Sequence, residues 1–392
     1  MKVLIIHNAY QQYGGEDAVV RLESELLIKN GDLVKLHIVS NDKIGGLWAK
    51  IITSIGVIFS WPAYQTTRKL IKAFSPDVVH VHNFFPLLSP AVFYACKKAN
   101  VPVVLTLHNY RLFCPTALLM FKGKVTEKSL RAGPWWALRH RVYRESLVGT
   151  LLLCLMIDVH NRIGTWKSVV DRFIVLTDFA RTKFSIAGLP SERLIVKPNF
   201  VDSPSLVDDI RDGFLFVGRI SEEKGIDILL SASALLPRGQ EAKSIFRIAG
   251  DGPLAASVQA NSCVCYLGKL NGEQVSIQMR KSQALLLPSV WYEGFPMVLV
   301  EAYANGLPVI ASRIGALAEL VEDGVTGLLF DPANPIELAE KILWAQQHPW
   351  ELEQMGRAAR QRYEERYTPD FNYLQLTAIY RETIDHHQTR RI

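Results

Sequence analysis

The chain has 392 residues, of which 49% are hydrophobic and 21% are charged. This composition is ordinary for a globular enzyme, and the length suffices for two or three domains with sizeable cores. Residues 1–201 carry 26 Lys and Arg against 13 Asp and Glu, a net charge of +13, whereas residues 202–392 carry −7. The basic half therefore predicts contact with an anion such as lipid headgroups, a lipid diphosphate or nucleic acid.

Three observations favour a cytoplasmic protein. The 5 cysteines show no Cys-x-x-Cys pair, which fits a reducing compartment better than a disulfide framework. The opening segment, residues 1–6, resembles a buried strand rather than a signal peptide. The longest apolar run, Leu147–Ile157, and the interrupted run from Trp48 to Trp61 are both too short to cross a bilayer as a simple helix.

Strand-like and helix-like segments alternate through the first half, which predicts a parallel α/β fold. Strands are expected at Val3–His7, Leu33–Val39, Val78–His82, Val103–Leu107, Phe173–Leu176 and Leu194–Val196, with helices at Glu16–Asn30 and Pro90–Ala99. A turn-rich segment, residues 197–204, is typical of a linker.

The alternation restarts after the linker. Strands are expected at Phe214–Val217, Ile245–Ala249, Cys263–Leu267, Ala284–Leu287, Val309–Ala311 and Gly327–Phe330, with helices near Gly225–Leu236 and Met297–Asn305 and mostly helix from Pro335 onward. Two such units in tandem are expected to meet at a cleft, with ligands beyond the carboxyl ends of the strands.

Glu293 and Glu301 flank the start of a predicted helix, one before it and one inside it. The amides of residues 294–297 lie at the helix N-terminus, where free N–H donors and the helix dipole favour anions. Carboxylates accept paired hydrogen bonds from vicinal diols. The pattern predicts a phosphorylated, polyhydroxylated ligand such as a nucleotide-sugar.

Arg219 and Lys224 flank a loop after the first strand of the second unit. Two cations there suit a diphosphate and the charge that grows on a leaving nucleoside diphosphate. The alternative is a solvated loop in which they pair with Glu222 and Glu223.

Weaker candidates lie at other strand ends. Gly14 and Gly15 precede a helix, where they either admit a phosphate or satisfy turn geometry. The acidic pair after them, residues 16–17, either favours the helix N-terminus by charge or contacts an acceptor. His108 ends a strand as either a core residue or a hydrogen-bond donor to substrate. No Asp-x-Asp, His-x-x-x-His or Cys/His cluster occurs in the sequence, so no preformed metal site is expected.

Glu293-x7-Glu301, Gly218-Arg219 with Lys224-Gly225, the Ala-Gly-Asp-Gly-Pro turn at 249–253 and the Gly14-Gly15 loop occur together and in order. With them the chain resembles, over nearly its whole length, a retaining GT-B glycosyltransferase of family GT4. The resemblance implies an α/β fold of two Rossmann-like domains facing a cleft. Residues 1–201 would bind the acceptor, residues 202–368 would bind the nucleotide-sugar, and the helix of residues 369–392 would cross back to the first domain.

The resemblance also implies residue roles. The expected catalytic residues are Arg219 and Lys224 on the diphosphate, Glu293 on the donor sugar and His108 near it. Glu301 would hold the ribose. The expected donor contacts are Gly14, Gly15, Gly218, Gly268, Lys269, Leu270, Gly294, Phe295, Pro296, Met297, Val298, Leu299 and Glu301.

The expected enzyme is a retaining hexosyltransferase that needs neither metal nor cofactor, with UDP-glucose as the favoured donor. The expected acceptor is a polyprenyl-diphosphate-linked saccharide or a growing polysaccharide of the bacterial envelope. The alternatives are another GT-B enzyme, an epimerase or phosphorylase, and a non-catalytic carbohydrate- or lipid-binding protein.

A basic stretch with two tryptophans precedes the apolar run, and together they span residues 122–157. Such a segment suits peripheral contact with anionic lipid on the inner face of the plasma membrane. The alternative is a solvated insertion over a buried helix. Nucleic acid is not an expected partner.

Overall fold

The computed structural model describes residues 1–9, 14–40, 56–202, 204, 210–236 and 245–389. The chain divides into two compact units, of which the first holds residues 1–121, 126–199 and 372–392. The second holds residues 122–125 and 200–371. The division therefore falls after Asn199 and Phe371, where the sequence predicts boundaries after residues 201 and 368.

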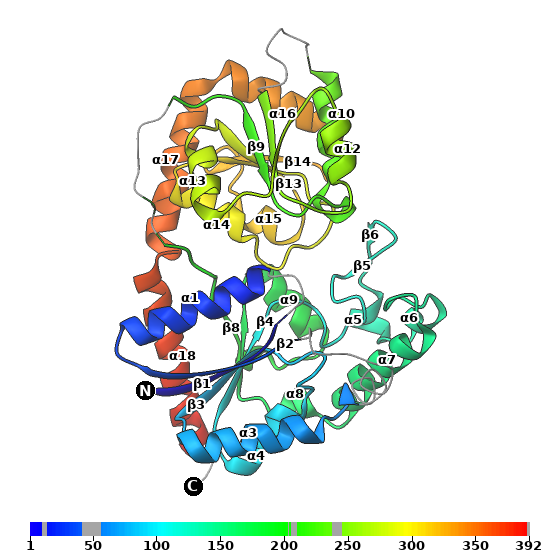
Figure 1. Ribbon diagram of the computed structural model, residues 1–392, viewed down its shortest axis with the longest axis vertical. Coiled ribbons are helices and arrows are strands. Elements are labelled where there is room, and N and C mark those ends of the chain that lie inside the picture. The colour runs from blue at the N-terminus through cyan, green and yellow to red at the C-terminus, as the bar shows by residue number, and fades with distance from the viewer. Residues whose placement is uncertain (10–13, 41–55, 203, 205–209, 237–244, 390–392) are drawn as a thin grey trace. The chain divides into compact units, whose positions relative to one another are not determined.

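The first unit is built on a 6-stranded sheet in the order β2-β1-β3-β4-β7-β8, in which all pairs are parallel (Figure 1). Its strands are β1 (Lys2–Ala9), β2 (Leu33–Ser40), β3 (Val78–Asn83), β4 (Val103–Leu107), β7 (Arg172–Val175) and β8 (Leu194–Val196). β3 and β4 are buried along their whole length. β4 is apolar except for Thr106, as expected of a central parallel strand, whereas β3 also buries His80 and His82.

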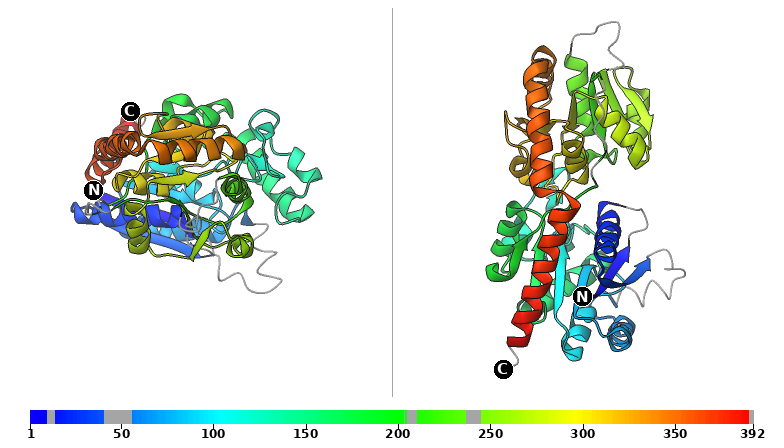
Figure 2. Two further views of the ribbon diagram at one scale, coloured as in Figure 1. Left: turned by 90° about the horizontal axis from the view of Figure 1, so that it is seen from above. Right: turned by 90° about the vertical axis from the view of Figure 1, so that its left-hand side faces the viewer.

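Helices cover this sheet, and a short hairpin, β5 (Met120–Phe121) and β6 (Lys124–Val125), follows β4 in the chain. The helices are α1 (Gly15–Lys29), α3 (Trp61–Phe74), α4 (Ala91–Ala99), α5 (Lys128–Ala132), α6 (Trp136–Arg139), α7 (Leu147–Arg162), α8 (Thr165–Ser168), α9 (Asp178–Ile186) and the 3-10 turn η2 (Ser191–Arg193). The last helix, α18 (Pro369–Thr389), packs Leu376, Ile379 and Tyr380 into the core of this sheet, alongside its strands (Figure 2).

The second unit repeats the design with a 6-stranded parallel sheet in the order β11-β10-β9-β12-β13-β14. Its strands are β9 (Phe214–Val217), β10 (Phe246–Ala249), β11 (Cys265–Gly268), β12 (Ala284–Leu287), β13 (Val309–Ser312) and β14 (Gly327–Phe330). The intervening elements are η3 (Glu222–Lys224), α10 (Ile226–Leu235), α12 (Ala255–Ala260), α13 (Gly272–Arg280), α14 (Met297–Ala304), α15 (Gly315–Leu320), α16 (Pro335–Gln347) and α17 (Pro349–Arg366).

The predicted α/β fold with two parallel sheets and a returning C-terminal helix is confirmed. The strands predicted at Val103–Leu107, Leu194–Val196, Phe214–Val217, Ala284–Leu287 and Gly327–Phe330 have these bounds in the structure. Helix α3 was not predicted, although it is amphipathic and buries Ala63, Thr67 and Ile71 at a spacing of four residues. The apolar run that precedes it lies largely outside the described residues.

Candidate functional site

The candidate donor residues of the second unit follow two adjacent strands. β9 pairs with β10 on one side and β12 on the other, so the chain order of the strands reverses between β9 and β12. Ligands of doubly wound sheets bind at such a reversal, beyond the carboxyl ends of the strands. The loop after β9 carries Gly218, Arg219 and Lys224, and the loop after β12 leads through Glu293 to α14. The fold thus brings together two segments that lie far apart in the sequence.

Glycines let three strand ends approach closely. Gly218 donates its amide to the Ala249 carbonyl at 3.0 Å, and Gly250 donates to the Gly268 carbonyl at 2.8 Å. A Cβ atom built on Gly250 would overlap the carbonyl oxygen of Gly218. The turn at residues 249–253 therefore packs its backbone directly against the loop that carries Arg219.

Lys224 and Glu293 form an ion pair at the candidate site. Nζ of Lys224 lies 2.7 Å from Oε1 of Glu293, and Oγ of Ser289 donates to the same oxygen at 2.7 Å. The Lys224 ammonium also lies 5.7 Å from the centre of the Trp291 ring. Glu293 is buried, and within the described chain no hydrogen bond reaches its Oε2, so this oxygen is available to accept from a ligand hydroxyl.

The contacts of these two loops correct and extend the sequence interpretation. Lys224 pairs with Glu293 rather than with Glu222 or Glu223, because η3 turns its side chain toward the loop after β12. A backbone bond from Val290 N to Glu223 O, 3.0 Å long, joins the two loops. The roles of Ser289 and Trp291 were missed, since neither belongs to a recognisable motif.

Arg219 is exposed at the carboxyl end of β9. Within the part of the chain that the structure describes, its guanidinium has no ion pair. An unpaired guanidinium fork on the same loop as Lys224 is suited to bidentate contact with a phosphate. The alternative of a loop neutralised by its own glutamates therefore does not describe Arg219.

Helix α14 begins directly after the Gly-Phe-Pro segment. Pro296 occupies the N-cap position, and its side chain cannot accept from the first amides of the helix. The Leu299 amide donates to the Pro296 carbonyl at 3.0 Å, whereas the amides of Met297 and Val298 have no partner within the helix. Gly294 is half-buried and Phe295 packs against Tyr367. The N-terminus of α14 is thus open to an anion.

Glu301 lies one turn inside α14. Burial raises the pKa of its carboxyl group. A carboxylate held partly out of water gains from ligand hydroxyls that donate to it, because they replace lost hydration. This environment suits the predicted ribose contact.

Gly268, Lys269 and Leu270 connect β11 to α13. Lys269 is exposed, and Gly268 has φ +70°, with open space where a Cβ atom would lie. The backbone at Gly268 therefore has open space beside it, and the contact of residues 268–270 with the base stays a prediction.

In the first unit, Gly14 and Gly15 start helix α1. Asp17 accepts from the Gly14 amide at 2.9 Å and lies 2.9 Å from Nε2 of His7. Glu16 accepts from Asn109 at 3.0 Å. The acidic pair after the glycines thus serves the helix N-terminus and its neighbours, which is the first of the two alternatives.

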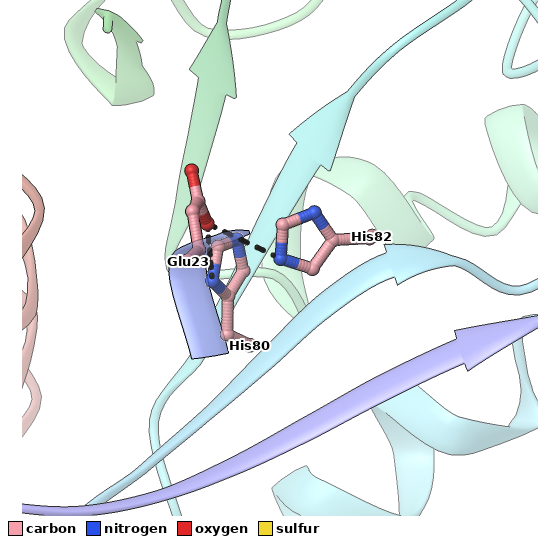
Figure 3. Close-up of side chains that lie close together, drawn as sticks. All are labelled: Glu23, His80 and His82. Carbon is pink, nitrogen blue, oxygen red and sulfur yellow. Dashed lines mark ion pairs between the residues drawn. The ribbon is translucent and has the colours of Figure 1, made fainter. Parts of the chain in front are cut away.

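His108 follows β4 and belongs to a group of polar side chains. Its Nε2 lies 3.1 Å from Nδ1 of His82 on β3, and burial lowers its pKa to about 4. Glu23 of α1 lies behind them, 3.4 Å from Nε2 of His82 and 2.8 Å from the Lys197 ammonium. Figure 3 shows Glu23 directed toward His82 and His80. This cluster was missed, although two histidines at alternate positions of a buried strand are a visible signal.

Glu23, His80 and His82 are residue types that bind metals, and their ligand atoms lie within 4.8 Å of one another. Both ring nitrogens of His80 already have partners, however, Tyr380 and Thr106, each at 2.7 Å. A cation here would also face the ammonium of Lys197. The contacts therefore favour a hydrogen-bonded network over a metal centre.

The basic stretch lies partly on the surface. Arg139, Arg141 and Arg144 are exposed, and Leu147 and Val148 at the start of α7 are 50% and 64% exposed. Of the two tryptophans, only Trp135 is exposed, because Trp136 donates to Ser129 at 2.7 Å and packs inward. The rest of α7 packs Leu153, Cys154, Met156 and Ile157 into the unit.

Among the described residues, no helix combines the length and apolar character that would let it span a membrane.

Residues 204–362 match the family described as glycosyl transferases group 1, and residues 49–150 match glycosyltransferase family 4. The chain is 28% identical over 359 residues to an uncharacterized glycosyltransferase of Methanocaldococcus jannaschii, covering 88% of each chain. It is 26% identical over 307 residues to the alpha-D-kanosaminyltransferase of Streptomyces kanamyceticus, covering 76% of this chain and 74% of that one.

Solved structures show the same fold. HepE of Anabaena in complex with UDP aligns with a TM-score of 0.66 at 19% identity, over 96% of this chain and 99% of that one. The sucrose-phosphate synthase of Thermosynechococcus elongatus aligns with a TM-score of 0.71 at 17% identity, over 98% and 99%.

Proposed function

The chain belongs to the group 1 glycosyltransferases of family GT4, and we propose that it transfers a hexose from a nucleoside-diphosphate sugar with retention of the anomeric configuration. The observation that carries this proposal is the ion pair of Lys224 with Glu293 beside the open N-terminus of α14. That arrangement offers cations and amides for a diphosphate and carboxylates for hydroxyls within one unit.

We assign donor roles to the side chains accordingly. Arg219, Lys224 and the amides of Met297 and Val298 bind the diphosphate. Glu293 accepts from hydroxyls of the donor sugar. Glu301 accepts from the ribose, and the backbone around Lys269 contacts the base. Gly14, Gly15 and His108 keep their predicted roles as contacts from the first unit.

The proposed reaction proceeds on one face of the sugar. The bond between the anomeric carbon and the phosphate oxygen breaks, and the acceptor oxygen bonds to the same face. The proton of the acceptor hydroxyl goes to the leaving diphosphate. Arg219, Lys224 and the α14 N-terminus stabilise the growing negative charge, which supports a reaction without a divalent ion.

UDP-glucose is the proposed donor, and the alignment with HepE, solved with UDP and with UDP-glucose, supports it. The proposed acceptor is a lipid-linked saccharide or growing polysaccharide of the bacterial envelope. The net charge of +13 in residues 1–201 supports an anionic acceptor of this kind. The proposed location is the cytoplasm, with peripheral contact at the membrane.

A panel of UDP-, GDP- and ADP-sugars tests the donor. The bound donor is expected to stabilise the full chain, by about 2.7 kcal/mol at 100 times its dissociation constant. Product analysis with a lipid-linked acceptor is expected to show the retained anomer, with turnover unchanged by EDTA. A donor that stabilises the chain but is neither transferred nor slowly hydrolysed would indicate a binding protein. Recovery of an epimerised donor would indicate an epimerase.

A further inference from the structure

A continuous chain of polar contacts runs from Lys197 to His108 inside the first unit. Nζ of Lys197 donates to Oε1 of Glu23 at 2.8 Å. Oε2 of Glu23 faces Nε2 of His82 at 3.4 Å, and Nδ1 of His82 lies 3.1 Å from Nε2 of His108. Lys197, Glu23 and His82 are at most 3% exposed, so water does not compete for these contacts. Figure 3 shows the part of this chain formed by Glu23 and His82.

The ionisation of Glu23 determines which nitrogen of His82 carries a proton. Although burial alone would raise the pKa of Glu23, the neighbouring Lys197 ammonium holds that pKa below its usual range. The carboxylate is therefore ionised and can only accept. Nε2 of His82 has no hydrogen-bond partner among the described residues, and Oε2 of Glu23 lies 3.4 Å from it. A bare Nε2 would turn its lone pair toward this negative charge, so the proton of His82 is favoured on Nε2.

The position of the proton on His82 determines the position of the proton on His108. Burial lowers the pKa of His82 and of His108, so both rings are neutral near pH 7 and each carries one N–H. With the proton of His82 on Nε2, its Nδ1 is an acceptor. The contact at 3.1 Å then requires the proton of His108 to lie on Nε2. Nδ1 of His108 remains as a bare nitrogen, and it has no hydrogen bond within the described residues.

We propose that Glu23 and His82 are positioning residues that hold His108 in the tautomer protonated at Nε2, so that Nδ1 accepts a hydrogen bond from a substrate hydroxyl. The identity of that hydroxyl, on the donor sugar, rests on the proposed function. A sugar hydroxyl can donate to this nitrogen, whereas an ionised phosphate oxygen cannot. The inference replaces the expectation that His108 donates to substrate.

A long-range proton–nitrogen NMR spectrum of the full chain, labelled with ¹⁵N-histidine, tests the tautomer without substrate. Nε2 of His108 is expected to resonate as a protonated nitrogen and Nδ1 as a bare one. The opposite pattern would overturn the inference, whatever the activity. If Nε2 is protonated and Nδ1 is bare but the protein transfers no sugar, the proposed function would be refuted and the tautomer inference would stand.

Two substitutions of His82 separate positioning from packing. The amide oxygen of His82→Asn can replace Nδ1 as the acceptor for His108, whereas His82→Leu fills the space without an acceptor. His82→Asn is expected to keep the His108 tautomer and kcat/KM. His82→Leu is expected to give a mixture of tautomers and to lower kcat/KM about tenfold, the effect of one lost neutral hydrogen bond. Equal behaviour of the two variants would overturn the inference.

A second variant keeps the test valid if His82→Leu does not fold. Glu23→Gln combined with Lys197→Met removes the buried charge pair as a unit, and an amide no longer dictates the proton of His82. Mixed tautomers of His108 are expected, and an unchanged spectrum would count against the inference. His37→Gln, on the edge strand β2, is the control and should leave the His108 signals unchanged.

The same samples exclude or establish a metal. Zinc bound stoichiometrically by Glu23 and His82 would require a bare Nε2 on His82 and would overturn the inference. Metal-free protein with the predicted tautomer would support it.

Discussion

At the residue scale, the Lys224 ammonium forms an ion pair with Glu293 and stays accessible to a ligand phosphate. Its ion pair with Glu293, 2.7 Å long, orients both side chains before any ligand is present. The Lys224 side chain is 24% exposed, so the ammonium can still reach a phosphate. Preorganised charges of this kind stabilise a departing anion at low cost.

Replacement of Arg219 or Lys224 by Ala is expected to lower kcat by about 10²–10³-fold each, the effect of losing one donor to the leaving group. Steady-state turnover with the identified donor measures this. Arg357→Ala is the control, because Arg357 is exposed on α17 and its ion pair, with Glu353, lies along its own helix. Near-normal turnover in both site variants would remove these residues from the diphosphate site.

Glu301 presents the opposite case, a carboxylate whose burial disfavours its charge. Its raised pKa means that the folded state ionises it at higher pH than the unfolded state does. The free energy of unfolding therefore falls as pH rises from the unfolded pKa through the folded pKa. At neutral pH the charge destabilises the free protein.

Glu301→Gln is accordingly expected to raise the Tm of the free protein at pH 7, with a gain that shrinks as the pH falls toward the pKa of an ordinary carboxyl. The same variant is expected to bind nucleotide about 10–100-fold more weakly, because it loses hydrogen bonds to a charged acceptor. Thermal unfolding across pH and calorimetric titration with UDP measure the two effects. Glu353→Gln, at an exposed position of α17, should change neither.

At the scale of elements, the site depends on how closely the loop after β9 approaches the loop after β12. Gly225 has φ +73°, and a Cβ atom there would overlap the carbonyl of Pro288. This glycine therefore permits the approach that brings Lys224 to Glu293. A local turn residue thus determines a contact between segments 69 residues apart.

Gly225→Ala is expected to destabilise the protein by more than Gly324→Ala. Both positions have positive φ, which alone costs an alanine about 1–2 kcal/mol. Gly324 has open space around it, whereas Gly225 adds an overlap with backbone that costs about 1–3 kcal/mol. Chemical denaturation measures both variants. Equal losses would show that the loop moves freely away from Pro288.

At the scale of the whole molecule, part of the excess positive charge of the first unit lies on exposed side chains. Arg139, Arg141 and Arg144 are exposed, and they precede the exposed Leu147 and Val148 in the chain by a few residues. Basic side chains beside exposed apolar ones suit the headgroup region of an anionic bilayer.

Substitution of Arg139, Arg141 and Arg144 by Ala together is expected to weaken binding to anionic vesicles about 100-fold, at about 1 kcal/mol for each charge near the surface. Co-sedimentation with phosphatidylglycerol vesicles at low and high salt measures this. Binding should weaken as salt rises, because screening shortens the range of the field.

The control for this variant is the triple substitution of Lys281, Arg357 and Arg366 by Ala, which removes the same charge from exposed positions of the second unit. Equal loss in both triple variants would mean that net charge, rather than this surface, directs membrane contact.

Local sequence patterns determined many of the strands, helices and loops of this protein. The apolar strands, helix α14 and the loops with Arg219, Lys224, Glu293 and Glu301 could be predicted, because strand alternation, turn glycines and helix starts act over a few residues. The order and spacing of these segments carried the resemblance to family GT4 glycosyltransferases.

Only the tertiary structure decided which side chains meet. The pairing of Lys224 with Glu293 depends on strand order in the second sheet, and the chain Lys197–Glu23–His82 joins residues up to 174 positions apart. Parallel sheets bring distant strand ends together, and no local period encodes that proximity. The loop motifs were therefore visible in the sequence, whereas the contacts from which we infer the proton state of His108 became visible only in the folded chain.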